Sequence, residues 1–116
     1  MAIRTELRCF QREAVLLPIS IIDDAGAAVD ITGYIFGFVV RARFAAVALF
    51  EVADADIDIV APPADGVVNV EITAATLDVA PDVYEWELRR TDSANDAVLA
   101  YGSFYVRRSL TEEVGS

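Results

Sequence analysis

The sequence predicts an all-β fold made of two sheets, because three of its features are typical of strands. Residues 34–41 place aromatic or branched side chains at every second position, which is the period of a strand with one buried face. Residues 84–88 alternate just as cleanly, with Tyr84, Trp86 and Leu88 on one face and two glutamates on the other. Turn-forming residues separate such segments at the short spacing of sandwiches and barrels. Trp86 is the expected centre of the core.

Two strands are expected before these segments, over Ile3–Phe10 and Ala14–Ile22. In the second, either the odd-numbered residues or their neighbours face the core, and Pro18 indicates an edge strand or a bulge because it cannot donate a hydrogen bond. The run follows three arginines as a signal peptide would, but Glu13 and Pro18 interrupt that pattern, so we interpret it as a strand. No apolar stretch approaches the roughly 20 residues of a membrane-spanning helix.

The strand over residues 34–41 follows a turn at Asp30–Gly33 and ends at Arg41. Beyond it, the alternation of apolar residues predicts further strands at Val47–Val52, Ile57–Val60, Val67–Ile72, Val83–Arg89 and Val98–Arg107. Two polar turns, at 62–66 and 92–96, divide this part of the chain.

Only Thr73–Ala80 has helical character, and it predicts one short helical turn that bridges the two sheets. We therefore expect one β-sandwich domain over residues 1–108, with about seven or eight strands. Residues 109–116 lack apolar periodicity and are expected to form a flexible C-terminal tail.

Residues 76–86 match the layout of a tyrosine corner, in which a tyrosine at the start of a strand hydrogen-bonds to backbone a few residues upstream. Tyr84 is that tyrosine. In an immunoglobulin domain a cysteine follows two residues later, and here Trp86 occupies that position, so its bulk replaces a disulfide. The sequence therefore predicts an immunoglobulin-like β-sandwich, with a small barrel as the alternative.

The charge of the chain limits its partners. It carries 19 acidic and 9 basic residues, a formal charge of −10, which repels nucleic acid and anionic membranes. All nine basic residues are arginine, and the absence of histidine removes the commonest general base and metal ligand. The high apolar fraction, 55%, is what a component of an assembly would show.

No set of residues predicts catalysis, a metal or a cofactor. Cys9 is the only cysteine, so we expect a small buried residue rather than a nucleophile. Asp54, Asp56 and Asp58 begin like a calcium loop with Asp65 at its twelfth position, but an isoleucine stands where the loop needs glycine, so we expect a solvated acidic edge. Glu85 and Glu87 on an outward strand face are interpreted in the same way. An enzyme is not expected.

The last strand is apolar on both faces, which has two interpretations. It is a central strand buried on both sides, or Leu99, Tyr101 and Tyr105 pack against a partner. The pairs Arg89–Arg90 and Arg107–Arg108 lie near strand ends, where they pair with the acidic residues of this chain or contact an acidic neighbour. The candidate partner contacts are Leu99, Tyr101, Tyr105, Arg107 and Arg108.

A family resemblance rests on segments that follow one another along residues 14 to 107. They are Asp24–Gly26, Val29–Gly33 with the strand that ends at Arg41, Gly66–Ile72, Thr76–Leu77, Tyr84–Leu88 and Gly102–Val106. In this order they resemble a family of small tailed-phage and prophage structural proteins, which are similar to the immunoglobulin-like N-terminal domain of baseplate upper proteins. One departure is Asp82–Val83, where that family commonly has glycine before the strand tyrosine.

The resemblance implies a non-enzymatic virion structural protein, namely a tail, baseplate or fibre-attachment adaptor that holds neighbouring subunits together. Its implied partners are other virion proteins and copies of itself, and its implied location is the virion, assembled in the host cytoplasm. Alternatives are a decoration protein on the capsid surface and a cell-surface or carbohydrate-binding module. Exposed aromatic residues in loops would favour such a module, but Tyr and Phe concentrate in the expected strands, which favours assembly.

Overall fold

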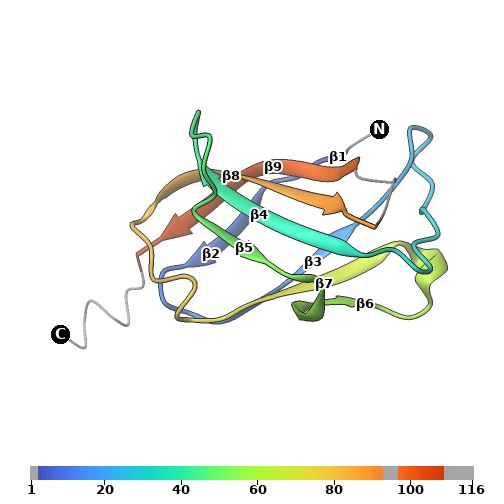
Figure 1. Ribbon diagram of the computed structural model, residues 1–116, viewed down its shortest axis with the longest axis horizontal. Helices are drawn as coiled ribbons and strands as arrows, with labels where there is room; N and C mark the ends of the chain where they lie inside the picture. Colours follow the sequence, from blue (N-terminus) through green and yellow to red (C-terminus); the bar gives the residue numbers. More distant parts are fainter. Residues whose placement is uncertain (1–2, 93–96, 109–116) are drawn as a thin grey trace.

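The computed structural model describes residues 3–92 and 97–108, which form nine strands in two sheets (Figure 1). The larger sheet has the order β1-β9-β8-β4-β5, with β2 also paired to β9, and the smaller has the order β3-β7-β6. The strands are β1 (Ile3–Arg4), β2 (Leu7–Phe10), β3 (Val15–Ser20), β4 (Phe36–Ala42), β5 (Phe50–Val52), β6 (Ile57–Ile59), β7 (Val67–Ile72), β8 (Asp82–Arg90) and β9 (Ala97–Arg107).

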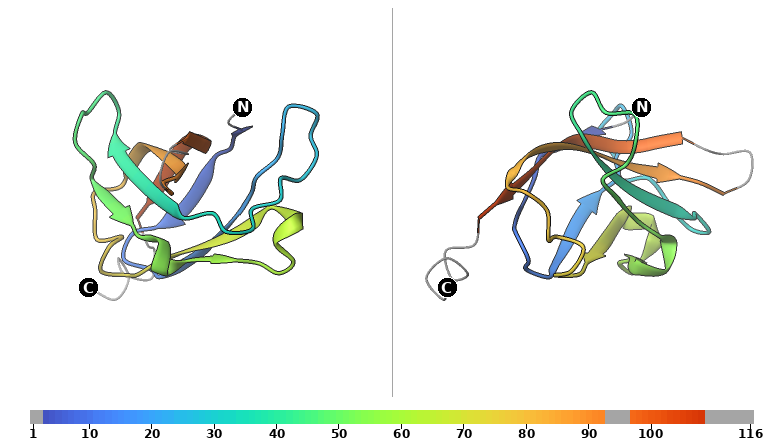
Figure 2. Two further views of the ribbon diagram at one scale, coloured as in Figure 1. Left: turned by 45° about the vertical axis from the view of Figure 1, so that its right-hand side comes forward. Right: turned by 60° about the vertical axis from the view of Figure 1, so that its left-hand side comes forward.

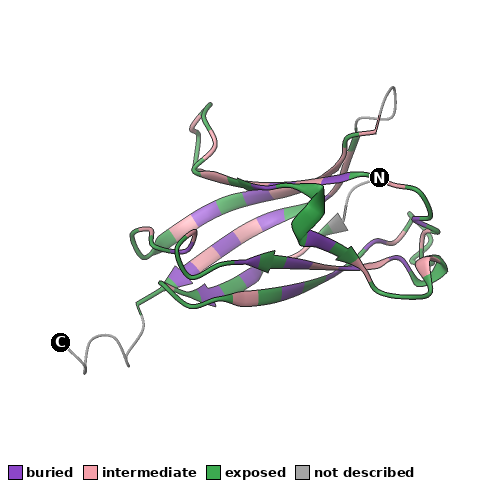
Figure 3. Ribbon diagram, turned by 60° about the horizontal axis from the view of Figure 1, so that its bottom comes forward, coloured by how far each residue is buried: buried purple, intermediate pink, exposed green. Residues whose placement is uncertain are grey.

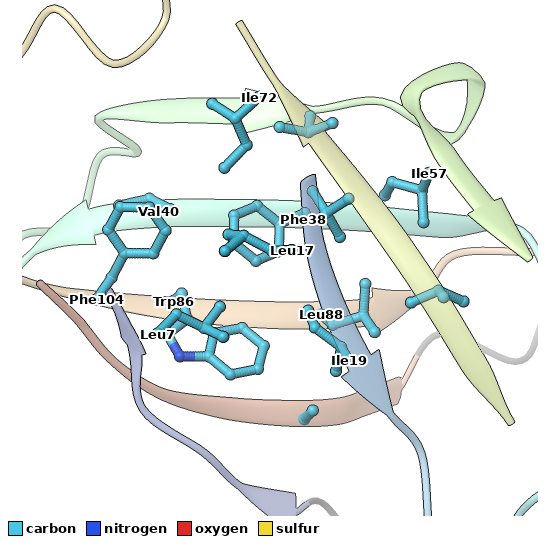
Figure 4. Packing of buried hydrophobic residues seen from close by; sticks show 14 of the residues in the cluster. Leu7, Leu17, Ile19, Phe38, Val40, Ile57, Ile72, Trp86, Leu88 and Phe104 are labelled. Carbon is cyan, nitrogen blue, oxygen red and sulfur yellow. The ribbon is translucent and has the colours of Figure 1, made fainter. Parts of the chain in front are cut away.

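The two sheets pack face to face around one hydrophobic core, so the barrel alternative does not apply. Leu17 and Ile19 of β3 lie over Phe38, Trp86 and the neighbouring side chains of the larger sheet (Figure 4). Trp86 is only 1% exposed and stacks on Phe38 with a ring-centroid distance of 5.6 Å. Buried and exposed residues alternate along the strands (Figure 3), and the predicted faces are confirmed for residues 36–41 and 84–88. The predicted start at Tyr34 is wrong by two residues, because β4 begins at Phe36.

A tyrosine corner closes the connection between the two sheets. The Tyr84 hydroxyl donates a hydrogen bond of 2.5 Å to the carbonyl oxygen of Ala80. The predicted helical turn just before it is a single hydrogen-bonded turn, in which the Leu77 amide donates to the Thr73 carbonyl at 3.1 Å. Together with the two packed sheets, this corner confirms the predicted immunoglobulin-like sandwich.

The strand predicted over Ile3–Phe10 is wrong in one respect, because it is divided into β1 and β2, which both pair in parallel with β9. At the break, the carbonyl oxygen of Thr5 accepts a hydrogen bond of 2.9 Å from the indole nitrogen of Trp86. A buried indole N–H needs such a partner. Gly102 leaves the room for it, because a Cβ there would lie 1.9 Å from the Thr5 oxygen.

A further strand boundary differs from the prediction, the position of Pro18 is settled, and two expected turns are helical. Val47–Val52 was expected as a strand, but only Phe50–Val52 is one, because the preceding residues leave the sheet in a loop. Pro18 lies on the edge strand β3, in line with the edge alternative. Two short 3₁₀ helices, Asp54–Asp56 and Pro63–Asp65, occupy expected turns.

Parts of the predicted organisation fall outside the described residues. The expected C-terminal tail, residues 109–116, is one of them, and residues 93–96 of the expected hairpin loop at 92–96 are another. Within the described ranges, no helix is long and apolar enough to cross a membrane.

Candidate protein-docking face

The outer face of the larger sheet, the face turned away from the core, is the most distinctive surface of the described chain. It holds a hollow of about 560 Å³ that spans β1, β9, β8 and β4. The side chains that line it on the outer face are Arg4, Val39, Arg41, Arg43, Glu85, Glu87, Val98, Tyr101 and Ser103. The register explains this set, because Arg41 lies opposite Glu85 and Glu87 lies opposite Tyr101 in neighbouring strands.

Arginine gathers on this face although the whole chain is acidic. Among the described residues, six of the nine arginines lie on it, together with four glutamates. The arginines are Arg4, Arg8, Arg41, Arg43, Arg89 and Arg107, and the glutamates are Glu6, Glu51, Glu85 and Glu87. We call this surface the basic face. Its local balance of +2 stands against −10 for the chain, so it attracts acidic groups that the rest of the molecule repels.

The arginines of the basic face contact aromatic rings and form ion pairs that solvent reaches at least in part. Arg8 lies 4.9 Å from the ring centroid of Tyr105 and bonds to Glu6 at 3.0 Å. Arg41 lies 3.6 Å from Glu87. Exposed pairs of this kind contribute at most about 1 kcal/mol, so an incoming carboxylate can compete for the guanidinium groups.

An exposed apolar loop lies beside the basic face. The loop between β4 and β5, residues 43–49, projects on the side away from the smaller sheet in both views of Figure 2. Its residues are largely apolar, and Phe44 is 93% exposed and Val47 78% exposed. Phe44 is therefore an exception to the expected concentration of Tyr and Phe in strands. This loop was missed because its run of apolar residues has the composition of a strand, although its alanines have low strand propensity.

The five predicted contact residues do not all lie on the same surface. Tyr101 and Tyr105 lie on the basic face beneath Arg4 and Arg8, and Arg107 lies at the end of the same row. Leu99 is the extra residue of a β-bulge in β9 and packs in part against the core.

The remaining contact residue, Arg108, follows the last strand and is exposed. Whether these residues meet a partner stays a prediction. Of the arginine pairs, both Arg89 and Arg90 take the intramolecular alternative. Arg89 lies 3.9 Å from Glu87. Arg90 forms the closer contact. It bonds to Asp92 at 2.7 and 3.0 Å and stacks 3.8 Å from the ring centroid of Tyr34. This hydrogen-bonded arginine holds the pKa of Asp92 below its usual value.

The residues considered for metal binding or nucleophilic chemistry have structural positions. Asp54 accepts a hydrogen bond of 2.8 Å from the backbone amide of Phe36, which secures the start of β4. Asp58 points away from the core on β6, and no three potential metal ligands cluster within residues 3–92 and 97–108. Cys9 is buried, and this burial raises the pKa of its thiol to about 11, which keeps it protonated and unreactive.

Comparisons with known proteins do not assign this chain to a family. No family model and no curated protein matches this chain. Among solved structures it is similar to NK cell receptor Nkp44, described as a triggering partner in natural cytotoxicity, with a TM-score of 0.44 and 15% identity over 94% of this chain and 99% of that chain. The immunoglobulin-like class of the present chain rests on its own strand order, sheet packing and tyrosine corner.

Proposed function

We propose that this chain is a non-enzymatic docking subunit, which binds an acidic protein surface through the basic face and the apolar β4–β5 loop. The observation that carries this proposal is the separation of charge, with six arginines on one face of a chain whose formal charge is −10. Complementary charge of this kind orients partners and raises the rate at which they associate. Exposed Phe44 and Val47 supply apolar contact area at its rim.

The setting that the sequence resemblance suggests is a phage particle, in which the chain would act as a tail, baseplate or fibre-attachment adaptor. The test is quantitative mass spectrometry of purified particles from the source strain. A structural subunit should be present in a fixed number of copies per particle. Its absence from particles that contain the major capsid protein would refute the virion setting.

The basic face is tested in the same particles with charge-neutralised variants. Arg41→Gln combined with Arg43→Gln should lower incorporation at least about tenfold if these contacts hold the subunit in place. Arg12→Gln is the matched control, because Arg12 lies off this face and its ion pair with Asp78 is exposed. Equal incorporation of both variants would remove the basic face from the proposal. Immunolabelling in electron microscopy would then distinguish a tail position from capsid decoration.

Phe44 favours a second candidate function, a cell-surface or carbohydrate-binding module. An exposed aromatic ring can stack on a sugar, but the ring is followed in the loop by Ala45, Ala46 and Val47, which offer no side-chain hydrogen bonds. Such a loop fits an apolar protein surface better than a glycan. Specific binding on a glycan array that disappears in Phe44→Ala would favour the carbohydrate function instead.

A further inference from the structure

A second hollow, on the opposite side of the sandwich, has the chemistry that the β4–β5 loop requires. It measures about 480 Å³, lies on the outer face of the smaller sheet and is lined by Ala14, Val15, Leu16, Asp58 and Glu71. Leu16 is 54% exposed and lies opposite Glu71 in the paired strands β3 and β7. The described strand residues of this outer face include no arginine, so the hollow combines an apolar floor with two carboxylates. We call it the acidic hollow.

The tip of the β4–β5 loop has the matching features. The guanidinium carbon of Arg43 lies 5.6 Å from the ring centroid of Phe44, so cation and ring form one unit. Phe44 has φ +64°, a left-handed conformation that bulky residues rarely adopt, and it presents its ring almost entirely to solvent. Backbone outliers of this kind concentrate at binding sites.

We propose that Arg43 and Phe44 of one copy bind in the acidic hollow of a second copy. The ring covers Leu16, and the guanidinium group lies between Asp58 and Glu71. This inference rests on the proposed docking function and names its partner. The same contact brings the basic face of one copy toward the acidic outer face of the next, so the charges are complementary over the wider surface as well.

The position of the two surfaces determines the geometry of the assembly. The β4–β5 loop projects away from the smaller sheet (Figure 2). The acidic hollow lies on the outer face of that sheet. Each copy therefore offers one loop tip and one hollow on opposite sides. Such a contact is heterologous and adds copies in a row, which closes only if the rotation between copies allows a ring.

The test uses sedimentation velocity of the purified full chain. The wild type should form species larger than dimers that grow with protein concentration and shrink between 50 and 500 mM NaCl, because salt screens the charges. Phe44→Ser, which removes the ring, and Leu16→Arg, which places a like charge in the hollow, should each weaken association at least tenfold. Ile35→Ser is the matched control, because Ile35 is an exposed apolar residue at the other end of β4 and should leave association unchanged.

Mixing the two variants provides the decisive result. The intact loop tip of the Leu16→Arg chain can bind the intact hollow of the Phe44→Ser chain. The altered hollow of the first chain and the altered loop tip of the second cannot bind a further copy. The mixture should therefore form 1:1 dimers that do not grow. Trp86 fluorescence of each variant checks that it is folded. Folded variants that stay monomeric when mixed, or a wild type that is monomeric throughout, would overturn the inference.

The test of self-association can succeed or fail independently of the test of the proposed function. A chain that is incorporated into particles but monomeric in solution would retain the docking function and overturn only self-association. A chain that self-associates as described but is missing from particles would retain the contact and refute the virion setting.

Discussion

Replacing Gly102 with alanine tests the arrangement that fixes the first strands against the last. The added Cβ would lie 1.9 Å from the carbonyl oxygen of Thr5 and 2.8 Å from its carbon, distances that real contacts do not reach. The clash involves backbone on both sides, so no side-chain rotation relieves it. Thr5 must move, although its amide bonds to the Tyr101 carbonyl at 2.8 Å and its oxygen bonds to Trp86 at 2.9 Å.

The loss of stability expected for Gly102→Ala has two causes. Overpacking a well-packed interior costs about 1–3 kcal/mol. Displacing the Thr5 carbonyl leaves the buried indole N–H without its acceptor, which costs about 1–3 kcal/mol more. Gly102→Ala should therefore lower the free energy of unfolding by about 2–6 kcal/mol, a large part of the stability of a domain this size.

The assay is urea unfolding followed by the fluorescence of Trp86, the only tryptophan in the chain. Gly37→Ala is the matched control, because a Cβ on this strand glycine meets only the Thr91 side chain, at 3.4 Å. Its free energy of unfolding should stay within about 0.5 kcal/mol of the wild type. An equally small change in Gly102→Ala, with unaltered fluorescence, would show that Thr5 does not approach the sheet in this way.

Three other predictions concern single side chains. Tyr84→Phe removes the hydrogen bond to Ala80 and should lower the free energy of unfolding by about 1–2 kcal/mol, with an unchanged denaturant slope; a neutral effect would mean that the corner contributes packing alone. Burial raises the pKa of Cys9 from 9.0 to about 11, so at pH 8 its thiolate fraction is roughly 100-fold lower than in the unfolded chain, and an aromatic disulfide should label it correspondingly slowly. The stability that the protonated thiol contributes is complete below pH 9 and is lost as the pH rises towards 11, and fast labelling of the folded chain at pH 8 would contradict this. Arg90 lowers the pKa of Asp92, so this pair stabilises the fold above roughly pH 4 and the contribution disappears as the pH falls through the lowered pKa. Asp92→Asn should make the free energy of unfolding less dependent on pH in this acidic range. If urea titrations of the variant show the same loss of stability at low pH as the wild type, the pair is not its cause.

The strands that follow a local rule could be predicted from the sequence. In β4 and β8 the apolar residues alternate because one face of each strand is buried along its whole length, so pattern and burial coincide. The tyrosine corner could also be predicted, because Tyr84 and Ala80 are close in the sequence. These elements were sufficient to identify an immunoglobulin-like sandwich.

Other features depend on contacts between distant residues and leave no local pattern. The division between β1 and β2 arises because the carbonyl of Thr5 bonds to Trp86, far along the chain. Residues 47–49 have the composition of a strand, but β5 begins only at Phe50, so the loop that carries the exposed Phe44 is longer than the sequence predicts.

The basic face could not be predicted for the same reason. Its arginines come from both ends and the middle of the chain, and only the strand order brings them onto one surface. Tyr101 and Tyr105 were identified as candidate contacts because their strand is apolar on both faces, whereas Arg4 and Arg8 carried no signal of their own.

The parallel pairing of β2 with β9 has a consequence for how the protein is made. Leu7 lies beside Phe104 and Cys9 beside Val106, so strands from the start of the described chain acquire neighbours only when β9 has been synthesised. At ribosomal rates of about 5–20 residues per second, that interval lasts roughly 5–20 s. During it, the growing chain exposes apolar residues and an unpaired edge of β8, a condition in which nascent proteins associate with chaperones. The larger sheet can therefore be completed only after translation has passed Arg107.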